Sequence, residues 1–262
     1  MLLAVIVLEG LLAVIALEQL GLEISLAAFA LILTLYFWVS KKDIKGDYVL
    51  LQQEEMPWLY EGIAEMARKA GISMPTVYIL DDYIPLAYSF KDTIVLSLGL
   101  FEVLDEDEIL AVAAHEIGHI KNGDTRLFPV LAYSRYLMIT FTVVLVILTT
   151  SLWTAVAAVI LYGMYELSRA NFLKDREFLA DETALKLLDV PMSLMKALEE
   201  LKYYEDLRSG AGVRVSAVPS IEPAIERRQK VPRIETHPSY DERIFRILVE
   251  INGSNMFNRR MQ

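Results

Sequence analysis

Four apolar runs restrict the folds open to this 262-residue chain more strongly than any other feature. They cover residues 2–17, 22–39, 127–149 and 152–167. Each run approaches the roughly 20 residues that an α-helix needs to cross the hydrocarbon core of a bilayer, although the first is slightly short. Short links join the members of each pair, so the sequence predicts two transmembrane hairpins. The alternative is that one pair forms a buried hairpin in the core of a domain.

The overall composition favours a membrane protein. Hydrophobic residues make up 55% of the chain and the mean hydropathy is +0.38, above the values of ordinary soluble domains. The net charge of −10 argues against a nucleic-acid partner, which would require a basic stripe. The chain has no cysteine, so a zinc site must be built from histidine and carboxylate side chains.

The first hairpin has neither the basic start nor the small-residue cleavage site of a signal peptide. We therefore expect residues 1–40 to stay in the mature protein. Glu9 interrupts the first run, and a carboxylate at that depth is costly and often functional. The alternative is that Glu9 is protonated or faces another helix.

Basic residues flank the predicted spans on one side only, since the two opposite tips contain no lysine or arginine. By the positive-inside rule, the polar regions and both chain termini are predicted to be cytoplasmic. The sequence thus indicates a multi-pass protein of the cell membrane, in contact with the lipid bilayer. The basic residues on this side are Lys41, Lys42, Lys45, Lys121, Arg126, Arg169, Lys174 and Arg176.

The motif His115-Glu116-Ile117-Gly118-His119 carries the clearest chemical signal. Histidines four residues apart lie on one face of a helix, so both imidazoles can bind one metal ion. Imidazole nitrogen suits zinc, which in catalytic sites takes three protein ligands and leaves a position for water. Glu116 can take the proton from that water. The alternative is a pair of hydrogen-bonded histidines on a buried helix face.

A third ligand is expected on another helix, and the candidate is Glu177 in the segment REFLAD. Asp181 lies four residues further on, on the same helical face. This spacing lets Glu177 bind the metal while Asp181 accepts the ring N–H of a ligand histidine, which fixes the tautomer of that histidine. The alternative is the solvated face of a charged helix, because Asp175, Arg176 and Glu182 lie beside them.

His237, in the segment THPSYDERI, is the only other histidine. A histidine or arginine near a metal can stabilise the oxyanion of a tetrahedral intermediate, and Arg243 is a plausible companion. A helix cap and a surface salt bridge explain these two residues equally well.

The rest of the chain is predicted to be mainly helical. An amphipathic helix is expected from Pro57, with Gly71 past its end, and two short β-rich runs at 76–80 and 93–97 indicate a small sheet. That sheet is too small for an α/β fold. Residues 208–235 are rich in Gly, Pro and charge, which predicts a mobile loop near the site or a partly disordered segment.

Helix boundaries can be predicted around the motif and at the end of the chain. Asp105 and Glu108 form a capping-box pattern before the motif, and Asn122-Gly123 provides a stop after it. The last helix is expected over residues 238–250, closed by Asn252-Gly253.

The segments HEIGHIKNGD, REFLAD and THPSYDERI occur in this order, with the second hairpin between the first two. They resemble the HtpX-type integral-membrane zinc metalloproteases, which are relatives of the CaaX prenyl endopeptidases, over most of the chain. The resemblance implies four transmembrane helices with a cytoplasmic, gluzincin-like α+β catalytic domain of the zincin class. The implied parts are transmembrane hairpins at 1–40 and 127–167, and two portions of the catalytic domain at 41–126 and 168–262.

The resemblance also implies the residues of the site. One Zn²⁺ per chain would be bound by His115, His119 and Glu177. Glu116 would be the general base, and Asp181 would support a ligand histidine.

His237 and Arg243 would lie beside the transition state. One departure stands out, because the family usually carries an Asn-Ala-Phe-like edge-strand motif and here Pro85–Phe90 occupies its place. Leu86 cannot make the hydrogen bonds of the amide, which weakens the expectation of side-chain recognition of the substrate backbone. Pairing through the backbone of the strand would be unaffected.

The resulting hypothesis is a membrane-embedded zinc endopeptidase that acts on protein or peptide substrates. By the resemblance, these would be misfolded or damaged membrane proteins, in a quality-control role. An alternative is a prenyl-protein processing endopeptidase, although such relatives carry more spans than four. A further alternative is a non-catalytic membrane scaffold or transporter, and the intact Glu116 argues against it. The sequence indicates no particular oligomeric state.

Overall fold

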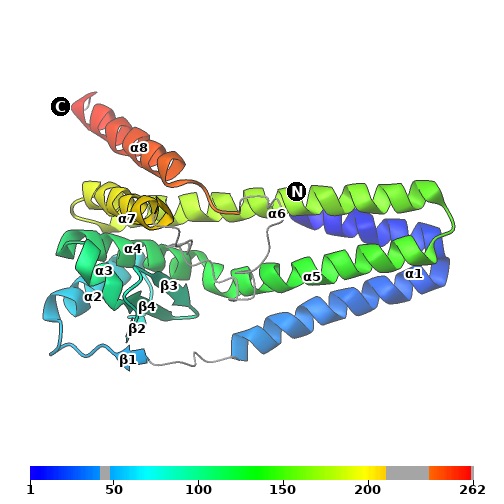
Figure 1. Ribbon diagram of the computed structural model, residues 1–262, viewed down its shortest axis with the longest axis horizontal. Helices are drawn as coiled ribbons and strands as arrows, with labels where there is room; N and C mark the ends of the chain where they lie inside the picture. Colours follow the sequence, from blue (N-terminus) through cyan, green and yellow to red (C-terminus); the bar gives the residue numbers. More distant parts are fainter. Residues whose placement is uncertain (42–47, 211–235, 261–262) are drawn as a thin grey trace. The chain divides into compact units, whose positions relative to one another are not determined.

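The computed structural model describes residues 1–41, 48–210 and 236–260 (Figure 1). The chain divides into two compact units, which we call the helical unit and the sheet unit. The helical unit comprises residues 1–43, 126–175 and 224–237, and the sheet unit comprises residues 44–125, 176–223 and 238–262. Most of the loop predicted at 208–235 lies outside the described residues.

The helical unit is formed by α1 (Leu2–Lys41), most of α5 (Asp124–Leu148) and the first part of α6 (Leu152–Leu187). α1 is interrupted at Glu18, which has a φ of 50° in the left-handed region, and its second arm folds back from the bend (Figure 1). The Ser25 hydroxyl of the second arm lies 3.4 Å from the carbonyl oxygen of Gly10 in the first. The first two apolar runs therefore form a helical hairpin, as the sequence predicts.

Polar contacts join the helices of this unit in its interior. Glu9 on α1 is fully buried, and its carboxylate accepts a hydrogen bond from the Thr142 hydroxyl on α5. The hydroxyls of Ser134 on α5 and Tyr165 on α6 are 2.7 Å apart. Glu9 therefore faces another helix, which is the alternative considered for it.

Among the described residues, two helices are long and apolar enough to cross a membrane, the Leu2–Trp38 part of α1 and α5. The first of them contains both apolar runs of the predicted first hairpin. The fourth run, 152–167, lies in α6, where Glu166 and Arg169 cut the apolar stretch short of a full span. The count of four transmembrane helices is therefore not confirmed, although the mainly helical class is.

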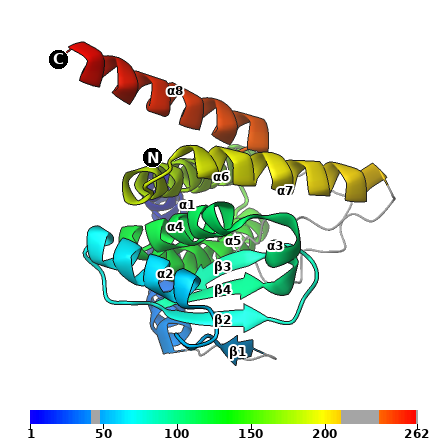
Figure 2. The ribbon, with the colours of Figure 1, turned by 90° about the vertical axis from the view of Figure 1, so that its left-hand side faces the viewer.

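The sheet unit contains a four-stranded mixed sheet in the order β1-β2-β4-β3 (Figure 2). β1 (Tyr48–Leu50) is antiparallel to β2 (Thr76–Leu80), which is parallel to β4 (Thr93–Ser97), and β3 (Ala87–Phe90) is antiparallel to β4. The strands predicted at 76–80 and 93–97 are confirmed with these bounds. β3 lies at an edge of the sheet, within the segment where the sequence suggests an edge strand.

The predicted boundaries of the motif helix are confirmed. α4 (Glu106–Asn122) begins with both hydrogen bonds of a capping box between Asp105 and Glu108. It ends at Gly123, whose φ of 77° is a left-handed conformation that glycine adopts without steric cost. α2 (Pro57–Ala70) likewise confirms the predicted amphipathic helix.

Three further helices complete the sheet unit together with the end of α6. They are α3 (Leu98–Val103), α7 (Met192–Gly210) and α8 (Tyr240–Arg260). The predicted stop at Asn252-Gly253 is wrong, because α8 continues past it to Arg260. A glycine inside a helix costs only about 1 kcal/mol relative to alanine, so one glycine does not have to end it.

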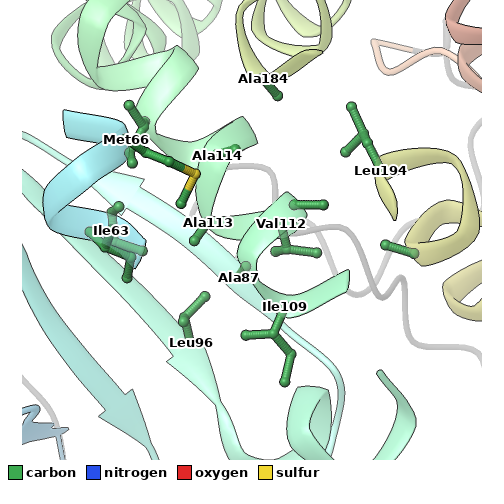
Figure 3. Packing of buried hydrophobic residues seen from close by; sticks show 14 of the residues in the cluster. Ile63, Met66, Ala87, Leu96, Ile109, Val112, Ala113, Ala114, Ala184 and Leu194 are labelled. Carbon is green, nitrogen blue, oxygen red and sulfur yellow. The ribbon is translucent and has the colours of Figure 1, made fainter. Parts of the chain in front are cut away.

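The core of the sheet unit is built around α4. It includes buried residues of the sheet and of α2, α6 and α7 (Figure 3). Ile63 of α2, Leu96 of β4 and Ala113 of α4 are fully buried there. Burying one isoleucine or leucine side chain stabilises a fold by about 1.5–3 kcal/mol. α4 also contacts β3 and α7 and carries small alanines on its buried surface. The helix that bears the histidine motif is therefore held on several sides.

Candidate metal centre

The two motif histidines converge on one point of the sheet unit. His115 and His119 lie on successive turns of α4, and each side chain is almost fully buried. Their Nε2 atoms are 3.1 Å apart and their rings meet edge to face. The i, i+4 spacing therefore has the geometric result that the sequence predicts.

Glu177 on α6 brings a carboxylate to the same point. Its oxygens lie 3.5 Å from the Nε2 atom of His115 and 3.5 Å from that of His119. These three side chains form a group that could hold a metal ion. Neighbouring ligand atoms in a tetrahedral zinc site with bonds of about 2.0–2.1 Å stand about 3.3 Å apart, which agrees with the separations here.

A close approach of α4 and α6 brings the three candidate ligands together. A Cβ atom on Gly118 would lie 2.8 Å from the carbonyl oxygen of Ala180, a distance that real Cβ atoms do not show. Gly118 lies between the two histidines in the motif, and Ala180 lies one turn after Glu177. The missing side chain at Gly118 thus allows the carboxylate of α6 to reach the histidines of α4.

His115 is oriented by a carboxylate and an arginine. Its Nδ1 atom is 2.9 Å from the Asp181 carboxylate, which therefore accepts the ring N–H. The Arg243 guanidinium on α8 donates to both oxygens of Asp181, at 2.8 Å from Nε and 2.5 Å from Nη2. The sequence places Asp181 beside a ligand histidine, and the structure brings the two together. Arg243 reaches the centre too, but it is paired with Asp181.

Electrostatics make the His115–Asp181 contact an ion pair in the metal-free protein. Burial and the Arg243 guanidinium oppose protonation of His115, but hydrogen bonds to Asp181 and Glu177 outweigh them and raise its pKa to about 9. Burial opposes ionisation of Asp181, yet Arg243 and His115 hold the pKa of this carboxyl below its usual value. A metal that binds here must displace the proton of His115, as is general for histidine ligands.

His119 has a similar arrangement that sequence reasoning missed. Its Nδ1 atom is 2.9 Å from the Asp124 carboxylate, whose other oxygen accepts a 2.5 Å hydrogen bond from Arg176 Nε. Arg176 also donates to the carbonyl oxygen of Asn122, at 2.6 Å. The available signal was an aspartate directly after the Gly123 helix stop, within reach of the last turn of α4.

These contacts fit a bound cation. With both Nδ1 atoms donating to carboxylates, the Nε2 atoms of His115 and His119 face each other and the Glu177 oxygens, and each Nε2 atom that carries no proton is an acceptor. Such a cluster of acceptors is unfavourable unless a proton or a metal ion lies among them. Two imidazoles and one carboxylate are also the donor set of many catalytic zinc sites.

Glu116 and His237 complete the account of the predicted site residues. Glu116 is buried, and its position on α4 lies about 100° around the helix from His115 and about 60° from His119. It is therefore adjacent to the ligand face. His237 belongs to the helical unit, so its predicted place beside the reacting carbonyl stays a prediction.

The departure at Leu86 has a local explanation. The Leu86 backbone N–H donates to the Ser97 hydroxyl at 2.8 Å, and the Ser97 N–H donates to the Leu86 carbonyl at 2.9 Å. Backbone bonds to β4 thus fix this position without an amide side chain. The segment continues into β3, whose outer edge has no neighbouring strand within the described sheet.

Comparison with known proteins adds an independent observation. The family model described as peptidase family M48 matches residues 53–250. Similar proteins include a protease HtpX homolog of Sulfurihydrogenibium, 27% identical with 75% of each chain covered. Another, from Pyrococcus furiosus, is 29% identical with 80% of each chain covered. A third, from Dictyoglomus turgidum, is 29% identical, with 90% of this chain and 84% of that protein covered.

Proposed function

Because the chain belongs to peptidase family M48 and is a metalloprotease, we propose that it is a zinc-dependent endopeptidase embedded in the cell membrane. The observation that carries the proposal is the convergence of two imidazoles and one carboxylate in a buried cluster. His115, His119 and Glu177 hold one Zn²⁺ per chain. When bound, zinc polarises a carbonyl group and lowers the pKa of water, which is the chemistry that peptide hydrolysis requires.

Glu116 is the proton carrier of the reaction. Its carboxylate takes a proton from the water molecule that attacks the scissile carbonyl carbon, and then delivers a proton to the leaving amine. The products are a new carboxyl terminus and a new amino terminus. Support for this role comes from the burial of Glu116 next to the ligand face of α4.

His237 and Arg243 have different roles in the proposal. His237 stabilises the oxyanion of the tetrahedral intermediate as a hydrogen-bond donor. Arg243 holds Asp181 through its Nε and Nη2 atoms and so acts on the site through His115, while its Nη1 atom stands 4.0 Å from the Glu177 carboxylate. Asp181 fixes His115 in the tautomer whose Nε2 atom binds the metal.

Support for the membrane location comes from the surface of the helical unit. Its helices expose many large apolar side chains, which a soluble surface rarely carries in such density. We propose two hairpins, 1–40 and 127–167, with the catalytic parts 41–126 and 168–262 and both termini in the cytoplasm, because the basic residues flank that side. Examples of these exposed residues are Leu11, Ile15, Phe29, Val143, Ile147, Trp153 and Val159.

The proposed substrates are protein segments in extended conformation. An extended peptide can pair with the backbone of β3 at the edge of the sheet, which gives affinity without sequence specificity. Such broad recognition suits the removal of misfolded or damaged membrane proteins. We therefore place the enzyme in membrane protein quality control.

The test is cleavage of an unfolded protein, casein, by the detergent-purified chain with zinc. Wild type should cleave casein, and Glu116→Gln should not, although it keeps stoichiometric zinc. Glu106→Gln is the matched control, because it makes the same change at an exposed position of α4 and should cleave like wild type. Cleavage by Glu116→Gln would refute the assignment of the base. Zinc-loaded wild type that cleaves neither casein nor membrane protein substrates would favour the scaffold alternative.

A further inference from the structure

We propose that Asp124 and Arg176 form a positioning pair for His119 and that this pair joins the two ligand helices at the metal. The inference rests on the proposed zinc site and extends it to residues outside the predicted ligand set. Asp124 and Arg176 touch neither the substrate nor the metal. They act by fixing which nitrogen of His119 faces the metal and where the carboxylate of Glu177 stands relative to it.

The burial of Asp124 is the first observation. Its side chain is fully buried, and burying an ionised carboxylate is costly unless it is paired and hydrogen-bonded. Each of its two oxygens has a partner, His119 Nδ1 at 2.9 Å and Arg176 Nε at 2.5 Å. One oxygen therefore sets the imidazole while the other is held by the guanidinium.

The geometry of Arg176 is the second observation. Its Nε and Nη2 atoms donate to different groups, the Asp124 carboxylate and the carbonyl oxygen of Asn122, at 2.5 and 2.6 Å. Only a planar guanidinium presents donors in such a fixed fork, so lysine cannot replace it. The Asn122 carbonyl belongs to the last turn of α4, where carbonyl groups lack helical partners.

The place of Arg176 in the chain is the third observation. It immediately precedes the ligand Glu177 on α6, and the two side chains point about 100° apart around the helix. One of them reaches the end of α4 and the other reaches the two histidines. Fixing Arg176 on α4 therefore also fixes the position of Glu177 along α4.

The competing interpretation is an ordinary buried ion pair at a helix end, which stabilises the fold but does not affect the metal. The two interpretations differ in what a conservative change does. Asp124→Asn keeps the size of the side chain and can still accept the His119 N–H, but it loses the charge that holds Arg176. A positioning role predicts a graded effect on metal binding, whereas a purely structural role predicts an effect on unfolding alone.

The experiment uses the full chain in detergent, in the Glu116→Gln background to prevent self-cleavage. The readouts are the zinc dissociation constant, by competition with a chelator, and the ligand-field absorption of the Co²⁺-substituted protein. Asp124→Ala should weaken zinc binding by about 10–100-fold and alter the Co²⁺ spectrum. Asp124→Asn and Arg176→Lys should fall between Asp124→Ala and wild type.

Asp175→Asn is the matched control, since it makes the same chemical change at an exposed position of α6, and it should match wild type. Unchanged zinc affinity and an unchanged Co²⁺ spectrum in folded Asp124→Asn and Arg176→Lys would overturn the inference. If Asp124→Ala does not fold, these two variants still decide the question. Failure of the proposed function appears differently, as absent zinc or absent proteolysis in the protein without any change at Asp124 or Arg176.

Discussion

The two proposed ligand histidines are held by the same chemistry, but their partners come from different places in the fold. Each imidazole donates its Nδ1–H to an aspartate, and each aspartate binds an arginine. Both partners of His115 lie on other helices, Asp181 on α6 and Arg243 on α8, 128 residues from His115. The Arg243 side chain is 6% exposed. For His119 the aspartate is only five residues away, and its arginine, Arg176, is 20% exposed.

This difference separates two functions that a buried ion pair can have. The support of His115 joins α4, α6 and α8, so it depends on the complete fold of the sheet unit and contributes to its stability. The support of His119 is made where α4 ends and beside the Glu177 ligand, so its main effect is local. We therefore expect changes around His115 to affect folding more, and changes around His119 to affect metal geometry more.

The largest effect should come from removing the ligands themselves. His115→Ala, His119→Ala and Glu177→Ala each delete one of three donors, so each should lose more zinc affinity than the roughly 10–100-fold expected for a supporting residue. Metal analysis after dialysis against a weak chelator measures this. His237→Ala, which leaves the donors intact, should retain zinc. Stoichiometric zinc in both His115→Ala and Glu177→Ala would refute the ligand assignment.

The next effect should distinguish the two aspartates. Asp181→Ala removes both hydrogen bonds of Arg243 to Asp181 and leaves the buried guanidinium with only the longer 4.0 Å ion pair to Glu177, which should cost up to about 3–5 kcal/mol in the free energy of unfolding. Asp124→Ala should cost less, because Arg176 reaches solvent more easily. Denaturant unfolding of the metal-free proteins makes the comparison. The double variant Asp181→Ala/Arg243→Met should recover part of the loss, and equal destabilisation by the two aspartate variants would contradict our distinction.

A smaller effect is expected where the ligand helices touch. Gly118→Ala should destabilise the sheet unit by about 1–3 kcal/mol, because the added methyl group overlaps the backbone of Ala180. It should also weaken zinc binding, since it separates α4 from Glu177. Gly163→Ala is a suitable control, because its Cβ would have no neighbour within 4 Å. Thermal unfolding and zinc titration of both variants test this, and unaltered zinc binding in Gly118→Ala would show that the separation of the helices is not critical.

The smallest effect should be found for an exposed ion pair on the same helix as Glu177. Glu182 and Lys186 form such a pair on α6, and their side chains are 41% and 66% exposed. Lys186→Gln should change the free energy of unfolding by at most about 0.5 kcal/mol, because solvent screens exposed pairs. Denaturant unfolding measures the loss. A larger loss would mean that an exposed ion pair stabilises this unit as much as a buried one, and that burial does not explain the expected difference between the Asp181–Arg243 and Asp124–Arg176 pairs.

Much of the sheet unit could be predicted from local patterns. The β-rich runs at 76–80 and 93–97, the capping box at Asp105 and the stop at Gly123 are set by neighbouring residues, and all appear as predicted. Asp181 could be placed beside a histidine because i, i+4 spacing on one helix relates it to Glu177.

Other features could not be predicted, because they depend on contacts between elements that the periodicity of one helix does not indicate. Asp124 lies beyond the left-handed turn at Gly123, so helical spacing from His119 does not extend to it. Arg176 reads as part of a solvated face until its partners on α4 are known. The end of α8 was mispredicted because a glycine only weakens a helix, and whether the helix continues depends on the residues around it.

The contact between Asp124 and Arg176 also marks the place where the chain leaves the sheet unit and returns to it. The sheet unit is left at Thr125 and re-entered at Arg176, and these two points lie beside one carboxylate. Proteins accept insertions where the entry and exit ends are close together, because the host then keeps its own geometry. In these terms residues 126–175 are an insertion within a host domain, the sheet unit. A short glycine-rich linker from Thr125 to Arg176, in place of residues 126–175, is therefore the natural design for a sheet unit that binds its metal without the insertion.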